Sequence, residues 1–301
     1  MPLYHYWGLV EARFGQALPR NVFVVKKALT FIVPLRHPEN ARDWGRLKNI
    51  LTETMRSIAA QESNDWQAVI VANHGADLPA LPPQFEVKRV DFPANPLSDI
   101  SKADPEQFWA SLRLDKGRRI LAGMLHAGEM GHIMVVDDDD FVSRRLASWV
   151  VKNKEANGWY FKKGYVWGTD AKLMYLFDDF HMFCGTSHIV RADLYKIPQK
   201  FEMVSDDYIR RMLGAHRFIK EELDASGTPL APLPFVGAIY RVGHDESVTK
   251  SKGVFSQFFR KREFFIHPRA FCRHLMRIRP IIKHKREEFF GWKPALHGGP
   301  A

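Results

Sequence analysis

Four consecutive aspartates, Asp137–Asp140, directly follow a short apolar segment, His132–Val136. An apolar run of this length is typical of a strand buried in a sheet, so four carboxylates arrive where the chain leaves the core. Adjacent negative charges repel one another, and none can be buried without a partner. A divalent cation such as Mg²⁺ or Mn²⁺ prefers oxygen ligands and would relieve this repulsion. The alternative is an acidic surface turn in water, the usual place of a charge run.

Strands and helices are predicted to alternate over the first half of the chain. Short β-rich runs predict further strands at 28–34, 67–72 and 85–90, and apolar residues at helical spacing predict helices over 40–61 and 108–127. This order is typical of an α/β fold with a mostly parallel, doubly wound sheet, in which ligands gather at the carboxyl ends of the strands. The second half is less regular, with strands expected at 183–190 and 238–242 and a helix over 206–220.

The positive charge of the chain is concentrated at its C-terminal end. The net charge is +10, and from residue 250 onward 13 Lys and Arg stand against three acids. Residues 1–249 are therefore neutral overall, which predicts a catalytic domain over 1–249 and a basic aromatic extension over 250–301. Cations among aromatic residues favour an anionic membrane surface. The alternative is a helical subdomain whose aromatic residues pack on the body.

The cellular location is predicted from three further features. Only two cysteines occur, Cys184 and Cys272, which is typical of a reducing compartment. The N-terminus has no basic-then-apolar leader, and no segment approaches the roughly 20 apolar residues of a membrane span. We expect a cytoplasmic protein that attaches peripherally to the inner face of the cell membrane through the extension.

Four short stretches resemble, in their order and spacing, the GT-A fold glycosyltransferases, closest to the inverting family 2 group. They are the first strand with its following loop, Val135–Asp140, Val204–Tyr208 and Tyr240–Thr249. The resemblance implies a GT-A-like, mostly parallel sheet flanked by helices, with a basic C-terminal helical extension. It also implies a metal-dependent enzyme that moves one sugar from a nucleotide-sugar donor to a hydroxyl. As in the family 2 group, the transfer is expected to invert the configuration of the anomeric carbon.

In this family an Asp-x-Asp motif binds the metal ion and the diphosphate of the donor. The best register here is Asp137 with Asp139, and Asp138 with Asp140 is the competing one. The resemblance favours Asp139 as the direct ligand. The expected metal ligands are Asp139, Asp137 and His244. A metal at this point would neutralise the charge that grows on the leaving diphosphate.

The resemblance also implies a set of residues around the nucleotide sugar. The family holds the nucleotide base after the first strand and the diphosphate near a basic segment, although a solvated helix start would explain that segment equally. After the second strand this chain has Asn73 where acids are usual, so Asp91 is expected to supply the carboxylate for the base or ribose. The expected residues are Pro34, Arg36, Asn73, Asp91, Lys116, Arg119, Asp137, Asp138 and Ser247.

An acidic pair, Asp206 and Asp207, opens the helix predicted over 206–220. The resemblance places the catalytic base at the second residue, Asp207, with Asp206 as the other candidate. An inverting transfer needs a carboxylate to take the proton of the acceptor hydroxyl. Acids at a helix N-terminus are also favoured by capping and by the helix dipole, which is the alternative interpretation.

The expected function is therefore a glycosyltransferase of polysaccharide or lipopolysaccharide biosynthesis. Its expected cofactor is Mn²⁺ or Mg²⁺, its donor a UDP-sugar, and its acceptor a glycan or a lipid-linked saccharide. The Gln-x-x-Arg-Trp motif of processive synthases is absent, which favours transfer of a single sugar. A metal-dependent nucleotidyltransferase or phosphotransferase remains an alternative. A nucleic-acid-binding protein is another, but we expect no nucleic acid because clustered acids repel a phosphate backbone.

Overall fold

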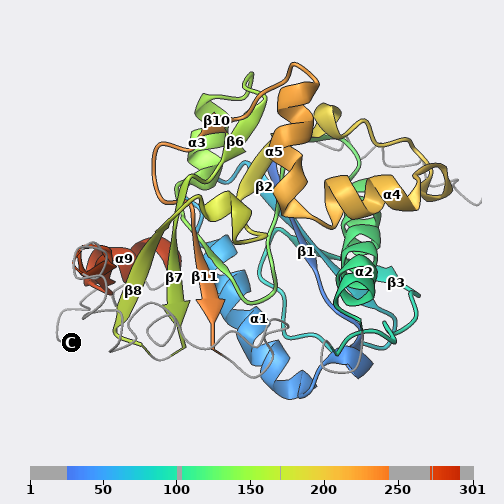
Figure 1. The fold of residues 1–301 in the computed structure, drawn as a ribbon, viewed down its shortest axis with the longest axis horizontal. Helices are drawn as coiled ribbons and strands as arrows, with labels where there is room; N and C mark the ends of the chain where they lie inside the picture. Colours follow the sequence, from blue (N-terminus) through green and yellow to red (C-terminus); the bar gives the residue numbers. More distant parts are fainter. Residues whose placement is uncertain (1–25, 100–103, 170, 244–271, 273, 292–301) are drawn as a thin grey trace, which may run out of the picture.

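The computed structural model describes residues 26–99, 104–169, 171–243, 272 and 274–291. Its larger sheet has seven strands in the order β10-β6-β9-β4-β1-β2-β3 (Figure 1). The strands are β1 Lys27–Pro34, β2 Trp66–Asn73, β3 Phe85–Val90, β4 Met130–Val135, β6 Gly158–Tyr160, β9 His188–Arg191 and β10 Ala231–Pro232. Strands β3, β2, β1 and β4 are parallel, and β9 runs antiparallel to β4. The expected mostly parallel sheet is thus confirmed in part, because four adjacent strands are parallel but the sheet as a whole is mixed.

Helices cover both faces of this sheet because successive strand residues point to opposite sides. On one face, Leu29, Phe31 and Val33 of β1 belong to the same core as α1 and α3. On the other face, Ile32 packs with α2, with the π-helix η5 and with α5. The helices are α1 Trp44–Ala59, α2 Pro105–Ala127, α3 Leu146–Lys152, α4 Asp206–Tyr208, η5 Ile209–Leu213, α5 His216–Ala225 and α9 Lys283–Phe289. Short 3₁₀ turns are η1 Pro38–Asn40, η2 Phe180–Met182, η3 Ala192–Tyr195 and η4 Phe201–Met203.

A second, five-stranded sheet lies beside the first and has the order β12-β8-β7-β11-β5 (Figure 1). Its strands are β5 Phe141–Val142, β7 Lys163–Gly168, β8 Leu173–Asp178, β11 Ala238–Val242 and β12 Ile278–Pro280. Only β11 was expected from the sequence. The strand expected at 183–190 is instead the short β9, because residues 183–187 form turns, in which the N–H groups of Phe183 and Cys184 donate to the Phe180 carbonyl.

The helix expected over 206–220 is divided into three pieces, α4, η5 and α5. The break comes at Gly214, which lies against the backbone of α2. A Cβ at Gly214 would stand 1.9 Å from the Arg113 carbonyl oxygen, so only glycine allows this approach. The break directs the start of α5 toward the carboxyl end of β4, where the acidic run lies.

Part of the extension expected over 250–301 packs on the rest of the described structure. Strand β12 pairs antiparallel with β8, and Phe289 of α9 is buried against Phe141, Met174 and Ile239. Residues 274–291 therefore support one of the two interpretations of the extension, in which its aromatic residues pack on the body. Among the residues that the structure describes, no helix is long and apolar enough to cross a membrane.

Candidate active site

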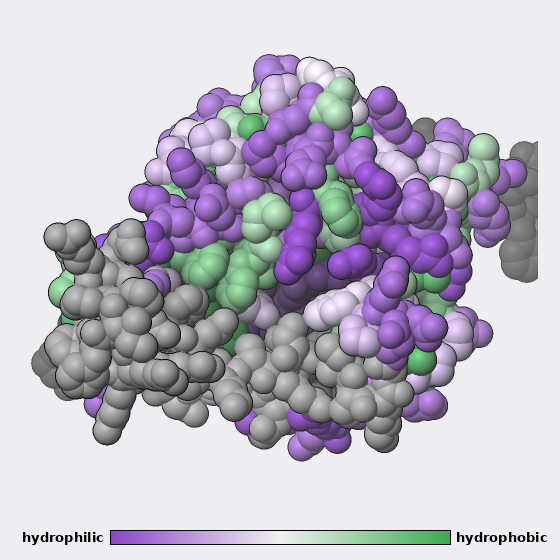
Figure 2. Space-filling view, viewed as in Figure 1, coloured by the Kyte–Doolittle hydropathy of each residue, from purple (hydrophilic) through white to green (hydrophobic). Residues whose placement is uncertain are grey.

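A cavity of about 450 Å³ opens between the carboxyl ends of β1 and β4, helix α2 and the start of α5. Figure 2 shows a hollow on this face, bordered mainly by hydrophilic side chains. Its charged lining residues are Arg36, Arg113, Asp115, Lys116, Arg119, Asp137, Asp138, Asp139 and Arg217. Of the residues expected to bind the nucleotide sugar or the metal, the cavity brings together Pro34, Arg36, Lys116, Arg119, Asp137, Asp138 and Asp139.

The four aspartates of the acidic run do not share one environment. Asp137, Asp138 and Asp139 line the cavity, whereas Asp140 is fully buried. One carboxylate oxygen of Asp140 accepts the Arg241 N–H at 3.1 Å, and the other accepts the Cys184 thiol at 3.3 Å. Burial, together with the charges of Asp139 and Asp137, raises the pKa of Asp140 well above its usual value. Asp140 therefore belongs to the core, and the register of Asp137 with Asp139 is the one that faces the cavity.

Asp137 is held from two sides at the cavity wall. Its backbone N–H donates to Thr186 Oγ1 at 2.9 Å, and Lys116 Nζ of α2 forms an ion pair with its carboxylate. About a quarter of each of these two charged side chains is exposed. Burial lowers the pKa of Lys116, but the charge and hydrogen bond of Asp137 outweigh it and hold that pKa above its usual value. Lys116 therefore stays protonated at neutral pH.

Gly185 makes room for this ion pair. A Cβ at Gly185 would lie 2.6 Å from Asp137 Oδ2 and 2.9 Å from Lys116 Nζ. Such distances are shorter than van der Waals contact, so any side chain here would displace the carboxylate or the ammonium group. The turn between η2 and β9 therefore contributes to the site through the absence of a side chain.

Asp138 lines the cavity next to the loop that follows β1. Arg36, two residues after β1, lies 3.7 Å from its carboxylate, and the backbone carbonyl of Asp138 accepts the Thr54 hydroxyl at 3.0 Å. The loop after β1 and the acidic run are in this way joined to each other and to α1. Arg36 and Asp138 together offer a cation and a carboxylate near Pro34, where the base of a nucleotide is expected.

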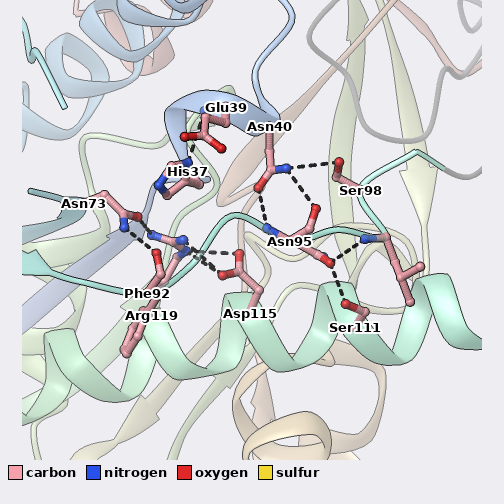
Figure 3. A network of polar contacts seen from close by, with 11 residues as sticks. His37, Glu39, Asn40, Asn73, Phe92, Asn95, Ser98, Ser111, Asp115 and Arg119 are labelled. Atoms are coloured by element: carbon pink, nitrogen blue, oxygen red, sulfur yellow. Dashed lines mark hydrogen bonds and ion pairs between the residues drawn. The ribbon is translucent and has the colours of Figure 1, made fainter. Parts of the chain in front are cut away.

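A buried polar network supports the wall of the cavity beneath these residues (Figure 3). The Arg119 guanidinium, only 1% exposed, donates to Asp115 at 3.0–3.2 Å and to Asn73 Oδ1 at 2.7 Å. Asn73 Nδ2 in turn donates to the Phe92 carbonyl at 2.6 Å. Because these groups bind one another, Arg119 and Asn73 position the wall and the loop after β3. A buried polar group keeps such partners at all times.

The same loop is tied to two other elements. Asn95 and Asn40 exchange two hydrogen bonds of 2.8 and 2.9 Å, which join the loop to η1, and Ser111 of α2 donates to Asn95 Oδ1 at 2.6 Å (Figure 3). Asp91, expected at the base or ribose, is exposed and is not among the residues lining the cavity. These hydrogen bonds fix the loop after β3 as a wall of the cavity. The expected role of Asp91 at the base or ribose stays a prediction.

The acidic pair expected to hold the catalytic base lies apart from the cavity lining. Asp206 pairs with Arg118 of α2 at 3.1 Å. Asp207 is exposed and lines a second cavity, of about 440 Å³, together with Tyr208, Arg211 and Glu222. Ser205 caps the start of α4 by accepting the Tyr208 N–H at 3.2 Å, as expected of a helix N-terminus. The assignment of Asp207 as base stays a prediction, as does that of Asp206.

Two expected site residues, His244 and Ser247, lie outside the residues that the structure describes. They directly follow β11, which ends at Val242 beside β7. Their expected roles as metal ligand and phosphate donor stay predictions.

The cavity residues that were not expected from the sequence include three with basic side chains, Arg113, His216 and Arg217. His216 begins α5, and its Nε2 is buried without a hydrogen-bond partner among the described residues. Burial, and secondarily the charge of Lys116, lowers its pKa to about 4. The sequence feature that could have indicated the place of His216 was the Gly214-Ala215 pair before it, which interrupts the helical pattern.

The carboxylates at the cavity suit an open site for Mg²⁺ or Mn²⁺. Within the described part of the chain no group of three or more His, Cys, Asp or Glu is arranged to hold a metal. Mg²⁺, however, is usually bound by one or two carboxylates, with waters and substrate phosphates completing its shell. Asp137 and Asp139 supply such a pair, so the donor set fits a metal that binds together with a nucleotide.

No protein-family model matches the chain, and no curated protein matches its sequence. The structure is similar to that of S. aureus TarS 1–349 (14% identity, 71% of this chain and 60% of that one, TM-score 0.39). It is also similar to a structure of TarS 1–349 in complex with UDP-GlcNAc (13% identity, 74% of this chain and 61% of that one, TM-score 0.39). A third similar structure is the complex of Mycobacterium tuberculosis H37Rv Rv0371C with manganese (11% identity, 71% of this chain and 91% of that one, TM-score 0.32). The chain thus spans about three-fifths of the length of TarS 1–349, and likeness at this level says nothing of its substrate.

Proposed function

We propose that this chain is a glycosyltransferase that uses a metal ion and a nucleotide-sugar donor. One observation carries the proposal. The cavity at the carboxyl ends of β1 and β4 brings Asp137, Asp139, Lys116 and Arg36 together, although they come from three separate stretches of the chain. Ligands of open α/β sheets bind at this edge. Carboxylates next to cations are the groups that a metal-bound diphosphate needs.

Each side of the cavity has its own task in this proposal. Pro34 and Arg36 would hold the nucleoside, on a wall that the Arg119–Asp115 pair supports. Asp137 and Asp139 would hold Mn²⁺ or Mg²⁺, and Lys116 would bind the phosphates. When bound, the metal supplies positive charge that neutralises the leaving diphosphate.

The proposal also covers the acceptor and the stereochemistry of the transfer. We expect a hydroxyl of a glycan or of a lipid-linked saccharide, attacked opposite the diphosphate with inversion at the anomeric carbon. Asp207 is the proposed base, although it lines the neighbouring cavity. A general base has to come within hydrogen-bond reach of the proton that it takes, and such contacts often form only when substrate binds.

Donor binding tests the proposal directly. UDP, GDP, CDP, ADP, UDP-glucose and UDP-GlcNAc are titrated calorimetrically with and without Mn²⁺. We expect metal-dependent binding of one nucleotide class, and its loss in Asp139→Asn. Asp77→Asn is the matched control, because Asp77 is an exposed carboxylate paired with Lys48 outside the cavity.

Two results would contradict the proposal. One is unchanged affinity and metal dependence in Asp139→Asn. The other is release of pyrophosphate from a nucleoside triphosphate, with no turnover of any nucleotide sugar, which would indicate a nucleotidyltransferase.

The base assignment has a separate test. Asp207→Asn should leave donor binding unchanged and lower turnover by roughly 10²–10⁴-fold, the usual contribution of a positioned base. Turnover at the wild-type rate, or a product that retains the donor's anomeric configuration, would remove this role from Asp207 while leaving the donor site in place.

A further inference from the structure

Lys116 and Asp137 form an ion pair at the place where both the metal and the diphosphate would bind. A carboxylate that already holds an ammonium group is a poorer ligand for a divalent cation, because the two positive charges repel each other. One of the two partners therefore has to leave before the metal is bound fully. The geometry around the pair indicates which one.

Asp137 cannot move far. Its backbone N–H is bound by Thr186 at 2.9 Å, and its Oδ2 lies close to the Gly185 backbone, where even a Cβ would stand only 2.6 Å away. The short side chain of an aspartate has two rotatable bonds, so its carboxylate keeps nearly the same position.

The Lys116 ammonium group can move, although the helix that carries it cannot. Gly117 packs so tightly on η5 that a Cβ there would lie 2.5 Å from the Ile209 carbonyl oxygen. This contact fixes the backbone of α2 next to Lys116. The lysine side chain has four carbons and three rotatable donors, and a quarter of it is exposed to the cavity. Because part of the pair is exposed to the cavity, an anion that enters there can reach the ammonium group.

We propose that Lys116 is an exchangeable counter-cation of Asp137 that makes metal binding depend on the nucleotide, an inference that rests on the proposed function. Without nucleotide, Nζ stays on Asp137 and weakens its affinity for Mn²⁺ or Mg²⁺. A diphosphate carries more negative charge than a carboxylate and draws Nζ away. Asp137 is then available to the metal, and Lys116 binds the phosphates.

This exchange predicts positive coupling between metal and nucleotide. Coupling between two sites is reciprocal, so each ligand tightens the binding of the other by the same factor. The usual range of such coupling is about 5- to 150-fold. Removing the lysine charge should increase the affinity for metal alone, lower the affinity for nucleotide, and reduce the coupling factor to the part that comes from direct bonds between the phosphates and the metal.

The test measures free Mn²⁺ by electron paramagnetic resonance during titrations, with and without the nucleoside diphosphate that binds most tightly among UDP, GDP, CDP and ADP. Lys116→Met keeps the length of the side chain and removes its charge. Lys48→Met is the matched control, because Lys48 forms a comparable ion pair with Asp77 outside the cavity. Thermal unfolding of both variants verifies that they are folded.

We expect wild type and Lys48→Met to bind Mn²⁺ weakly alone and at least about 5-fold more tightly with the nucleotide. Lys116→Met should bind Mn²⁺ alone more tightly than wild type and gain less from the nucleotide than wild type does. If its affinity for Mn²⁺ alone is unchanged or lower, or if its coupling factor equals that of wild type, the exchange is wrong while the proposed function stands. If wild type binds neither Mn²⁺ nor any of the nucleotides, both are wrong.

Discussion

Neighbouring residues of one type have different roles in this site, because each meets different partners. Asp140 accepts hydrogen bonds from Arg241 and Cys184 in the core, whereas Asp137 and Asp139 face the cavity. The acidic run is therefore neither a simple surface turn nor a cluster of four equivalent metal ligands. Its first three members line the cavity, and its last member anchors β11 to the site.

The space left by Gly185 leads to a prediction. In Gly185→Ala the new Cβ would stand 2.6 Å from Asp137 Oδ2, so the carboxylate has to shift. We expect the affinity for Mn²⁺ with nucleotide to fall by about tenfold, which corresponds to about 1.4 kcal/mol. Isothermal titration calorimetry measures this loss. Gly168→Ala is the control, since a Cβ there would meet no atom closer than 4.0 Å. Equal affinity in both variants would contradict the tight fit.

The buried imidazole of His216 predicts a pH dependence of stability. Burial and Lys116 lower its pKa to about 4, whereas an unfolded histidine titrates near 6.5. The unfolded chain therefore binds more protons between these values, and stability is lost as the pH falls from 6.5 to 4. This group contributes up to about 3 kcal/mol. In His216→Gln, urea unfolding between pH 7 and 4 should show a smaller loss than in wild type. Parallel curves for the two proteins would contradict the prediction.

At the scale of elements, the site depends on how closely α2 approaches the segment from η5 to α5. Gly117 and Gly214 both lie against backbone carbonyls of the opposite element. Helix α2 carries Lys116 and Arg119, and the start of α5 carries His216 and Arg217, so this contact sets the width of the cavity. The π-helical turn η5 lies directly before the break.

Gly214→Ala should therefore affect both stability and binding. Its Cβ would meet the Arg113 carbonyl oxygen at 1.9 Å, so the two elements have to separate. Overpacking of this kind costs about 1–3 kcal/mol. We expect a lower free energy of unfolding in urea and weaker nucleotide binding. A variant as stable as wild type would show that the two elements are not in tight contact.

At the scale of the whole molecule, residues 274–291 complete the second sheet and its core. Strand β12 extends the sheet at β8, and Glu288 of α9 accepts hydrogen bonds from Ser143 and Arg145 at 2.9 Å. Phe289 is 1% exposed. Deleting this segment would remove part of the core, so its expected role at a membrane has to be tested by substitutions at exposed positions.

Exposed apolar residues near cations of this segment suit an anionic membrane surface. Met276 is 69% exposed and Ile282 is 52% exposed. Arg277 and Arg279 lie between them in the sequence, and Lys283 follows Ile282. Apolar side chains insert at the headgroup boundary, and each cation adds about 1 kcal/mol. We predict salt-sensitive binding to phosphatidylserine vesicles, weakened in the double variant Met276→Ser with Ile282→Ser. Met203→Ser is the control, because Met203 is equally exposed, at 68%, on η4. Equal co-sedimentation of the double variant and the control would contradict the prediction.

The sequence by itself determined the alternating elements from β1 to β4 and the arrival of carboxylates at the end of β4. Hydrophobic periodicity is local, so the predicted strand at 85–90 matches β3 in full and the predicted helix over 108–127 ends where α2 ends. The positions of Pro34, Arg36 and Asp139 at one cavity also followed, because parallel strands end at the same edge of a sheet. Lys116 lies on helix α2, and its place at the cavity was expected only from the family resemblance.

Only the tertiary structure decided how these residues are paired and which aspartate is buried. The partners of Asp140 come from residues 184 and 241, and the partner of Asp137 comes from α2. The second sheet joins β8 to β12 over about a hundred residues, and Gly214 separates α5 from η5 within a single predicted helix. Contacts between residues far apart in the chain leave no periodic pattern in the sequence. Their energies depend on distances and burial that exist only once the chain has folded.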